Sequence, residues 1–493
     1  MRSINHWIGG KSIPGGSGRH GTVFDPATGT VQAEVAFASV EEVDQAVAVA
    51  DEAFGSWRST SLSRRSEVLF NFRQLLHDRG SEVVDAISAE HGKVRSDAAG
   101  ELARGLENVE FACGIPSLLK GEFSEQASTG VDVYSIRQPL GVVAGITPFN
   151  FPAMVPLWMC ANAIACGNTF VLKPSEKDPS ASLVLAELFA EAGLPEGVFN
   201  VVQGDKVAVD RLLEHPQVAA ISFVGSTPVA REIYRRGTDA GKRVQALGGA
   251  KNHMVVLPDA DVGLAADAAV SAGYGSSGER CMAVSVVVAV GAVADPLVEA
   301  IAERATRVKV GPASDPDAEI GPLISAEHRD RVRGYVAGAT AEGAEVVLDG
   351  GDAGGDGYFF GPSLLDRVQP GTRAYEDEIF GPVLSVTRVD SYAEAVRLVN
   401  DNPYGNGTAI FTRDGGAARR FQFEAKCGMV GINVPIPVPV AYYSFGGWKA
   451  SLFGDRHIYG PEGVDFYTQG KVVTARWPDP ATSSVDLGFP RTR

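Results

Sequence analysis

The chain of 493 residues and 51.8 kDa is long enough for two or three domains, and its 45% hydrophobic and 21% charged residues are typical of a globular protein rather than a disordered one. Its 44 basic and 60 acidic residues give a net charge of −16, which argues against a nucleic-acid-binding role. Five cysteines without a Cys-x-x-Cys pair exclude a disulfide framework and a zinc ribbon, and they favour a reducing, cytoplasmic location.

The pattern of apolar residues predicts no targeting segment and no membrane segment. Residues 1–21 lack a basic region followed by an apolar run, so no secretory signal is expected. The longest apolar stretches, such as residues 284–290, fall well short of the roughly 18 to 20 residues that span a bilayer. We therefore expect neither nucleic acid nor a membrane among the partners.

About the first hundred residues are expected to be mostly helical. Apolar residues recur at helical spacing over residues 40–54, 64–92 and 98–111. After Gly121 the sequence pattern changes to alternating polar and apolar residues up to Gln138, which predicts a strand or hairpin that leaves the main body. Residues 470–477 alternate in the same way and are expected to pair with that excursion.

The next part of the chain alternates between predicted strands and predicted helices. Short apolar runs lie at residues 141–146, 169–172, 197–202 and 219–224, and each is followed by a helical stretch. Strands that alternate with helices of about 10 to 15 residues indicate right-handed crossovers and a parallel sheet.

A second series of the same kind begins near Gly248. Strands are expected at residues 253–257, 285–290, 382–388 and 407–412, and helices at residues 260–271, 295–307 and 327–342. This alternation predicts a second α/β domain.

Cys281, in the segment Gly278-Glu-Arg-Cys281, is the candidate nucleophile. It lies between a glycine-rich turn and a predicted strand, a position expected to face a cleft, and the guanidinium of Arg280 would favour its thiolate. The alternative is a buried structural thiol, which describes most free cysteines. Three other cysteines in helical patterns are assigned that alternative: Cys113, Cys160 and Cys166.

Three polar segments follow predicted strands. Thr147-Pro-Phe-Asn-Phe-Pro152 holds an asparagine between two prolines, where its amide could donate to an oxyanion or simply form part of a turn. Lys173-Pro-Ser-Glu176 could hold the hydroxyls of an adenosine ribose or form a solvated loop. Phe223-Val-Gly-Ser-Thr-Pro228 places Gly and Ser at a helix N-terminus, which can receive a pyrophosphate.

In their order along the chain, these segments resemble the aldehyde dehydrogenase superfamily over essentially the whole length. A Leu-Gly-Gly turn, Glu378-Ile-Phe-Gly-Pro382 and Asn402-Pro-Tyr-Gly405 complete the series. The resemblance implies an α/β fold with a Rossmann-like NAD-binding domain, an α/β catalytic domain and a β-hairpin oligomerisation element. The expected bounds are 1–120 and 139–246 for the first, 247–445 for the second and 121–138 with 460–477 for the third, followed by a disordered tail at 478–493.

In that family a cysteine attacks the aldehyde, an asparagine stabilises the tetrahedral oxyanion, and hydride passes to NAD. The resemblance assigns the first two roles to Cys281 and Asn150. It also implies cofactor-binding residues. Lys173 and Glu176 would bind the adenosine ribose, Ser226 the pyrophosphate and Glu378 the nicotinamide ribose, and the other matching positions are Thr147, Phe149, Lys177 and Gly248.

One departure from the family pattern concerns release of the product. Hydrolytic members have Glu-Leu-Gly-Gly, and that Glu activates water. Here Ala246, or Gln245 under a shifted alignment, occupies the position, and neither side chain can take a proton from water near neutral pH. A thiol would then have to release the thioester. This pattern, together with Asn433-Val-Pro-Ile-Pro-Val-Pro439, is similar to the CoA-acylating methylmalonate-semialdehyde dehydrogenase subfamily.

The resemblance to that subfamily implies NAD-dependent oxidative decarboxylation of methylmalonate or malonate semialdehyde, with acyl transfer to CoA that gives propionyl-CoA or acetyl-CoA. Such a substrate carries a carboxylate, for which Arg280 and Arg104 are the candidate ligands. Arg104 could instead pair with Glu101 or Glu107 on its own helix. The alternative activity is a hydrolytic NAD-dependent aldehyde dehydrogenase that produces a carboxylic acid.

The remaining expectations concern assembly and metals. The resemblance implies a homotetramer or homodimer and a role in valine, inositol or β-alanine breakdown. The eight histidines show no metal-ligand spacing, so no metal site is expected. A non-catalytic binding protein is a further alternative, and the presence of both Cys281 and Asn150 argues against it.

Overall fold

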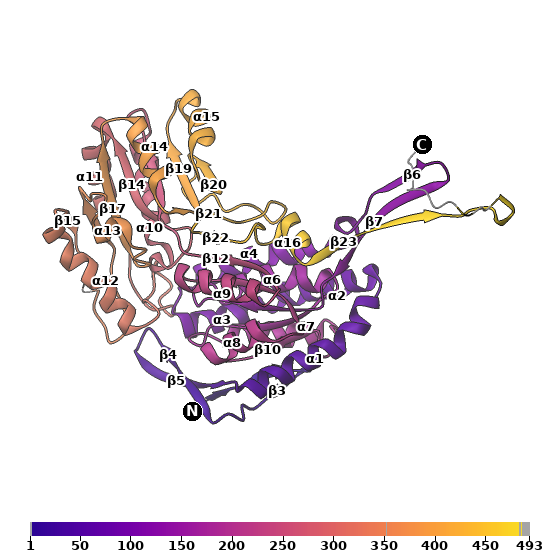
Figure 1. Ribbon diagram of the computed structural model, residues 1–493. Helices are drawn as coiled ribbons and strands as arrows, with labels where there is room; N and C mark the ends of the chain where they lie inside the picture. The colour runs from indigo at the N-terminus through magenta and orange to yellow at the C-terminus, as the bar shows by residue number, and fades with distance from the viewer. Residues whose placement is uncertain (1, 352, 483–484, 486–493) are drawn as a thin grey trace.

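The computed structural model describes residues 2–351, 353–482 and 485. Figure 1 shows a body with two lobes, from which a narrow sheet projects on one side. The lower lobe contains most of the first half of the chain, and the upper lobe contains residues from the second half. Each lobe is built around its own sheet, which confirms the predicted α/β class.

Five strands precede the first helix, so the expectation of a mostly helical beginning is wrong for this part. They are β1 (Arg2–Ile4), β2 (His6–Ile8), β3 (Lys11–Ile13), β4 (Arg19–Asp25) and β5 (Thr30–Phe37). Strands β1, β5 and β4 form a separate sheet, whereas β2 and β3 extend the large sheet of the lower lobe. The strands β1, β2 and β3 have three residues each, which give little periodicity, and one partner of β2, the strand β10, lies nearly two hundred residues away in the chain.

The predicted helices that follow are present, with one division. They are α1 (Val40–Ser59), α2 (Leu62–Asp78), α3 (Gly80–His91) and α4 (Arg95–Cys113), with a short α5 (Ile115–Leu118). The stretch predicted as one helix over residues 64–92 breaks at Arg79. The Ser39 side chain accepts from the Glu42 N–H, and the Glu42 side chain accepts from the Ser39 N–H, so α1 begins with a capping box. Gly92, with φ +86°, ends α3.

The sheet of the lower lobe has the order β22-β12-β11-β8-β9-β10-β2-β3. Its five central strands are parallel: β8 (Val142–Ile146), β9 (Thr169–Lys173), β10 (Phe199–Val201), β11 (Val218–Val224) and β12 (Arg243–Leu247). The first four match the predicted parallel strands, whereas β12 was not predicted, because its sequence Arg-Val-Gln-Ala-Leu has no continuous apolar run. The alternating helices are α6 (Met154–Ala165), α7 (Ser180–Glu191), α8 (Lys206–Glu214) and α9 (Thr227–Asp239). One edge strand, β22 (Leu452–Phe453), comes from the end of the chain and pairs antiparallel with β12.

The sheet of the upper lobe has the order β15-β16-β17-β14-β13-β19-β20. Four of its strands match the predicted ones: β13 (Asn252–Val256), β14 (Val284–Val290), β17 (Val383–Val389) and β19 (Gly407–Phe411). The other three are β15 (Glu345–Leu348), β16 (Ser363–Asp366) and β20 (Met429–Ile432). The helices are α10 (Val262–Tyr274), α11 (Ala294–Ala305), α12 (Ala326–Ala339), α13 (Arg373–Glu376), α14 (Tyr392–Asp401) and α15 (Gly415–Glu424).

The projecting sheet consists of β6 (Phe123–Ser128), β7 (Val131–Pro139) and β23 (Thr468–Arg476). Strand β23 runs antiparallel to β7 over nine residue pairs, from Thr468 opposite Pro139 to Arg476 opposite Val131. The predicted pairing of these distant segments is therefore confirmed. The domain bounds remain a prediction, and most of the predicted tail at 478–493 lies outside the described residues, apart from a 3-10 turn at Pro480–Thr482.

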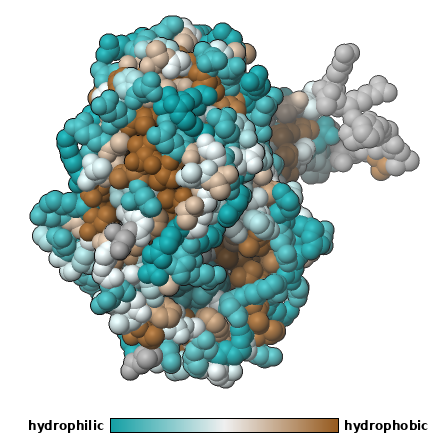
Figure 2. All heavy atoms as spheres, turned by 90° about the vertical axis from the view of Figure 1, so that its left-hand side faces the viewer, coloured by the Kyte–Doolittle hydropathy of each residue, from teal (hydrophilic) through white to brown (hydrophobic). Residues whose placement is uncertain are grey.

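The surface is mostly hydrophilic with separate apolar patches. Figure 2 shows one face, on which brown apolar residues gather in patches between teal hydrophilic ones and partly edge a hollow. Among the described helices, none is long and apolar enough to cross a bilayer.

Candidate active site

A cavity of about 570 Å³ contains most of the predicted site residues. This volume is in the range of roughly 300 to 1,000 Å³ that is usual for small-molecule sites. Seven of the predicted residues line it: Phe149, Asn150, Lys177, Ser226, Gly248, Cys281 and Glu378. Ten lining residues were not predicted as site residues: Pro148, Val224, Gly225, Gly249, Ile324, Ser325, Glu327, His328, Arg331 and Phe380. Three further predicted cofactor residues, Thr147, Lys173 and Glu176, do not line the cavity.

The topology of the lower sheet explains why distant segments meet here. Strands β12, β11, β8 and β9 are neighbours and parallel, so their carboxyl ends lie along one edge. Asn150, Lys177, Ser226 and Gly248 follow β8, β9, β11 and β12, respectively. Ligands bind at this edge of open α/β sheets because the loops that follow the strands converge there.

The start of α9 has a free anion-binding position. Ser226 is the N-cap residue, and its side chain makes no capping hydrogen bond. A Cβ at Gly225 would lie 2.4 Å from the Phe223 ring, so only glycine fits beside it. Backbone N–H groups and the helix dipole at this end attract an anion. These residues therefore fit the pyrophosphate of a dinucleotide.

Gly248 and Gly249 allow the chain to approach Glu378 closely. A Cβ at Gly248 would lie 2.8 Å from the Ala450 carbonyl oxygen, and a Cβ at Gly249 would lie 2.2 Å from Glu378 Oε2. The Ala250 N–H donates to Glu378 Oε1 at 2.9 Å. Burial raises the pKa of the Glu378 carboxyl to about 7. The carboxylate is thus fixed by one oxygen at the wall of the cavity.

The loop after β9 brings Lys173 and Glu176 together. Lys173 Nζ donates to Glu176 Oε2 at 3.0 Å, and the Thr147 N–H donates to the Lys173 carbonyl oxygen at 3.1 Å. These residues lie at the same sheet edge as the cavity-lining ones, although they are not part of its wall. Their roles in binding an adenosine ribose stay a prediction.

Cys281 follows a strained turn between α10 and β14. Ser276, Ser277 and Gly278 have left-handed backbone, and a Cβ at Gly278 would lie 2.2 Å from the Gly381 carbonyl oxygen. The side-chain amides of Asn252 and Asn406 donate to the Cys281 carbonyl oxygen at 3.0 and 3.1 Å. These two asparagines fix the position of Cys281. Their segments, Gly249-Ala-Lys-Asn-His253 and Asn402-Pro-Tyr-Gly-Asn-Gly407, resemble the methylmalonate-semialdehyde dehydrogenase subfamily, but nothing in these sequences predicts the contact with Cys281.

The Cys281 thiol is half-buried in the cavity wall. Burial, and next the Glu378 carboxylate, raise the pKa of this thiol to about 12, whereas the Lys93 ammonium lowers it. Arg280 was expected to favour the thiolate. However, Arg280 Nη2 donates to Asp97 Oδ1 at 2.6 Å, so its charge is paired. Lys93 is the cation that acts on the thiol pKa.

Asn150 is buried and held from two sides. Its side-chain Nδ2 donates to the Glu279 carbonyl oxygen at 3.0 Å, and Lys93 Nζ donates to its backbone carbonyl oxygen. An amide nitrogen carries two hydrogens, so one N–H remains for a ligand in the cavity. The Glu279 side chain is itself buried, and this burial raises the pKa of its carboxyl to about 8.

Neither predicted substrate-binding arginine lines the cavity. Arg104 Nη1 donates to Glu107 at 2.7 Å, which is the alternative pairing that the sequence allowed, and Nη2 donates to the Pro439 carbonyl oxygen at 2.8 Å. The Tyr459 hydroxyl donates to the same Pro439 oxygen. Arg104 is thus held by Glu107 and by the segment of Pro439, and its carboxylate-binding role stays a prediction.

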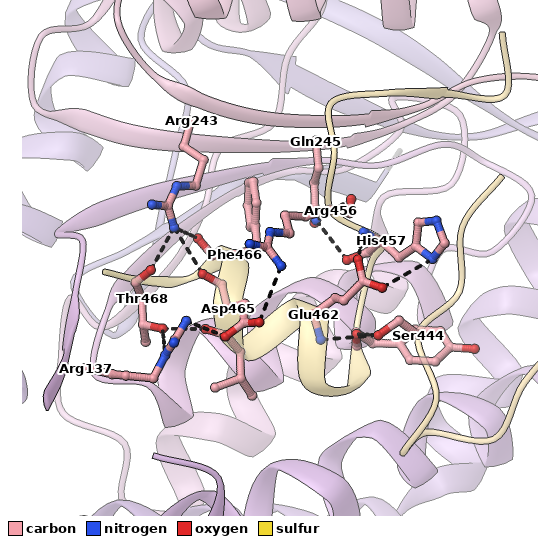
Figure 3. Close-up of polar contacts among 12 residues, drawn as sticks. Arg137, Arg243, Gln245, Ser444, Arg456, His457, Glu462, Asp465, Phe466 and Thr468 are labelled. Carbon is pink, nitrogen blue, oxygen red and sulfur yellow. Dashed lines mark hydrogen bonds and ion pairs between the residues drawn. The ribbon is translucent and has the colours of Figure 1, made fainter. Parts of the chain in front are cut away.

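The two residues at the position of the hydrolytic base point elsewhere. Ala246 is fully buried in β12, where it pairs with Phe453 of β22. Figure 3 shows Gln245 directed towards the segment of Arg456 and His457. Its Oε1 accepts from the Ser222 hydroxyl at 2.8 Å, and its Nε2 donates to the His457 carbonyl oxygen at 3.2 Å. Neither residue lines the cavity.

Three of the other cysteines and His253 have structural surroundings. Cys113, Cys160 and Cys166 are buried, as predicted. The His253 ring donates from Nδ1 to the Lys251 carbonyl oxygen and shares a hydrogen bond with the Tyr375 hydroxyl, and its burial lowers its pKa to about 4. Within the described ranges, no group of three His, Cys, Asp or Glu side chains could hold a metal ion.

Comparison with known proteins identifies the family. A model of the aldehyde dehydrogenase family matches residues 13–473. The chain belongs to the aldehyde dehydrogenase family. It is 55% identical to a malonate-semialdehyde dehydrogenase from Pseudomonas aeruginosa, with 99% of this chain and 100% of that protein covered. It is 48% identical to malonate-semialdehyde dehydrogenase 2 from Geobacillus kaustophilus, with 97% and 99% covered.

Solved aldehyde dehydrogenase structures have the same fold. A methylmalonate-semialdehyde dehydrogenase from Oceanimonas doudoroffii is 53% identical and superimposes with a TM-score of 0.96 over 98% of this chain and 99% of that one. A Sinorhizobium meliloti protein solved in complex with NAD is 51% identical, with a TM-score of 0.97 over 98% and 99%. The aldehyde-dehydrogenase-like fold expected from the sequence is therefore confirmed.

Proposed function

We propose that this aldehyde dehydrogenase is a CoA-acylating, NAD-dependent enzyme that oxidatively decarboxylates methylmalonate or malonate semialdehyde. The observation that carries the proposal is the absence of a base where hydrolytic relatives have glutamate, because Ala246 and Gln245 are both buried away from the Cys281 cavity. The names of the relatives from Pseudomonas aeruginosa and Oceanimonas doudoroffii support the same substrate class.

The first step is attack of the Cys281 thiolate on the aldehyde carbon. The carbonyl oxygen becomes an oxyanion, which the free N–H of Asn150 and the Cys281 backbone N–H would receive. Hydrogen-bond donors fixed before the reaction stabilise such a charge without reorganisation. Asn252 and Asn406 support this step because they fix the backbone that carries the thiol.

The residues at the sheet edge fit NAD. Ser226 at the start of α9 would receive the pyrophosphate, Lys173 and Glu176 the adenosine ribose, and Glu378 the nicotinamide ribose. Bound NAD would supply the acceptor for the hydrogen and the electron pair of the thiohemiacetal carbon, which leaves an acyl thioester on Cys281. The Sinorhizobium meliloti relative solved with NAD supports this choice of cofactor.

Two events then convert the thioester into products. The β-carboxylate leaves as CO2, and the electron pair of the broken carbon–carbon bond forms an enolate, which the Asn150 donor would stabilise and a proton would quench. The CoA thiolate then attacks the carbonyl carbon and displaces the Cys281 thiolate. The products are propionyl-CoA from methylmalonate semialdehyde or acetyl-CoA from malonate semialdehyde.

The test of acylation is a stopped-flow measurement of NADH with malonate semialdehyde and methylmalonate semialdehyde, each with and without CoA. Without CoA we expect a burst of about one NADH per active site, as an accumulating acyl-enzyme gives. Because no base occupies the position that activates water in hydrolytic relatives, CoA should raise the subsequent steady rate by at least about tenfold. Full turnover without CoA would identify the hydrolytic alternative instead.

Arg104→Leu tests the binding of the substrate carboxylate. Loss of a charge-assisted hydrogen bond should raise the KM of carboxylated aldehydes by about 10- to 100-fold and leave the KM of propanal unchanged. Steady-state kinetics with CoA would measure both values. Arg73→Leu is the control. Arg73 lies on α2 and pairs with Glu110, which is on the same helix as Arg104, so this variant also removes an arginine bound to α4. Equal losses for both aldehydes would contradict a carboxylate role.

The proposal extends to assembly and setting. The projecting sheet exposes apolar side chains such as Phe123 and Val472, and this exposure supports a homodimer or homotetramer that covers them. We further propose a cytoplasmic enzyme of valine, inositol or β-alanine breakdown. Size-exclusion chromatography with light scattering would measure the assembly, and a monomer would contradict this part.

A further inference from the structure

We propose that Lys93 and Glu101 are positioning residues for Asn150. This inference rests on the proposed oxyanion role of Asn150. Neither residue lines the cavity, and neither belongs to a motif that the function uses. Both side chains are nevertheless almost completely buried, directly behind the loop that carries Asn150.

Lys93 reaches the Asn150 loop from the turn between α3 and α4. Its Nζ donates to Glu101 Oε2 at 2.6 Å and to the Asn150 backbone carbonyl oxygen. The same ammonium lies 4.1 Å from the centre of the Phe151 ring. Lys93 therefore contacts two consecutive residues of the loop, and one of them is Asn150 itself.

Glu101 holds the other end of the loop. Its Oε1 accepts from the backbone N–H groups of Ala153 and Met154 at 2.8 and 3.1 Å, where α6 begins. These N–H groups have no partner within the helix, and a carboxylate there is favoured by the helix dipole. Glu101 thus fixes the point at which the loop ends, while its second oxygen binds Lys93.

The contacts leave Asn150 with little freedom. Its carbonyl is bound by Lys93, its amide donates to the Glu279 carbonyl oxygen, and the helix three residues later is fixed by Glu101. The remaining amide N–H can then point in only one direction. A small displacement of such a donor weakens its hydrogen bond to the oxyanion and slows the reaction, because that bond depends on distance and angle.

A stabilising role alone does not account for a charged pair at this place. Taking two charges out of water costs about as much as their attraction returns, and apolar residues of similar volume often serve the fold equally well. The bonds of this pair instead converge on the two ends of the Asn150 loop, which fits a role in fixing the position of Asn150.

The first experiment compares Lys93→Met with Lys242→Met. Lys242 is also buried, and its ammonium also donates to two backbone carbonyl oxygens, but it lies at the opposite end of β12 from Gly248. Lys93→Met should slow the NADH burst by about 10- to 100-fold while the Kd for NAD changes less than about threefold. Lys242→Met should keep the wild-type burst rate. Equal slowing by the two substitutions would overturn the proposal.

The second experiment uses Glu101→Gln, which also provides the test if Lys93→Met does not fold. Glutamine keeps an acceptor for the Ala153 and Met154 N–H groups but removes the counter-charge that holds Lys93. The NADH burst should slow by about tenfold, whereas the rate of Cys281 alkylation by iodoacetamide, which creates no oxyanion, should change by less than about threefold. A wild-type burst rate, or an equal loss in both rates, would overturn the positioning role of Glu101.

The third measurement separates this inference from the proposed function. If Lys93 acts through Asn150, the double variant Lys93→Met/Asn150→Ala should have the burst rate of Asn150→Ala alone, within about threefold. If the burst of the double variant were slowed by the product of the two single fold-decreases, the inference would be overturned. A wild-type burst in Asn150→Ala would instead refute the oxyanion role, whereas a slow Asn150→Ala beside a normal Lys93→Met would refute only the positioning role.

Discussion

Cys281→Ala is expected to lower NADH formation by at least about 10⁴-fold, because the substitution removes the only atom to which the acyl group is attached. The burst and the steady state should both disappear, with either semialdehyde and with or without CoA. Stopped-flow absorbance of NADH would measure the loss. Binding of NAD, measured by fluorescence, should persist, since its predicted contacts are made by residues at or after the ends of β8, β9, β11, β12 and α13.

Cys427→Ala is the matched control for that experiment. Cys427 is also a free cysteine, but it is buried in the core of the upper lobe. Its loss should cost about 1 kcal/mol of stability, as removal of a small buried group does, and leave the burst intact. An NADH burst that survived in Cys281→Ala would contradict the nucleophile assignment.

Much of the site could be predicted because it depends on local order along the chain. Each of the strands β8, β9 and β11 contains a short apolar run and is followed by a loop. Once those strands are parallel neighbours, their loops must share an edge. This rule brings Asn150 and Ser226 to one cavity. Gly248 follows β12, whose polar residues interrupt the apolar pattern, so only the order of the motifs located it. The motif order then identified Cys281 from the second lobe.

Contacts between distant side chains could not be predicted in this way. The pairing of Arg280 with Asp97 joins residues 183 positions apart, so the sequence suggested a free guanidinium beside the thiol. The contact of Lys93 with Asn150 spans 57 positions and leaves no periodic signal. Short strands such as β2 are also invisible, because three residues cannot establish an alternation. The charge surrounding Cys281 is thus a tertiary property.

The contacts of Gln245 with distant residues could not be predicted from the sequence either. The sequence left open whether Gln245 or Ala246 takes the position of the hydrolytic base. In the structure Gln245 is part of a polar cluster that ties β12 to the end of the chain, where Arg243 Nη1 donates to the carbonyl oxygens of Phe466 and Thr468 (Figure 3). A glutamine held by both its oxygen and its nitrogen cannot turn towards Cys281.

Asn150→Ala should slow the NADH burst by about 10²- to 10³-fold, which corresponds to about 2.7 to 4 kcal/mol of lost stabilisation of the oxyanion. Because alkylation by iodoacetamide creates no oxyanion, its rate at Cys281 should change by less than about threefold. The ratio of the burst rate to the alkylation rate therefore separates the effect of losing the amide donor from any effect on the reactivity of the thiol. Asn200→Ala is the control, since this buried asparagine on β10 also donates its amide to a backbone carbonyl, that of Gly197.

Asn150→Asp sharpens this prediction. Aspartate has nearly the shape of asparagine, yet its ionised form cannot donate, and it adds a negative charge beside the developing oxyanion. The burst should therefore be slower than in Asn150→Ala, although aspartate restores the volume that alanine removes. A role in packing predicts the reverse order, because the better filled variant would then be the faster one. The order of the two burst rates decides between an electrostatic and a structural function for Asn150.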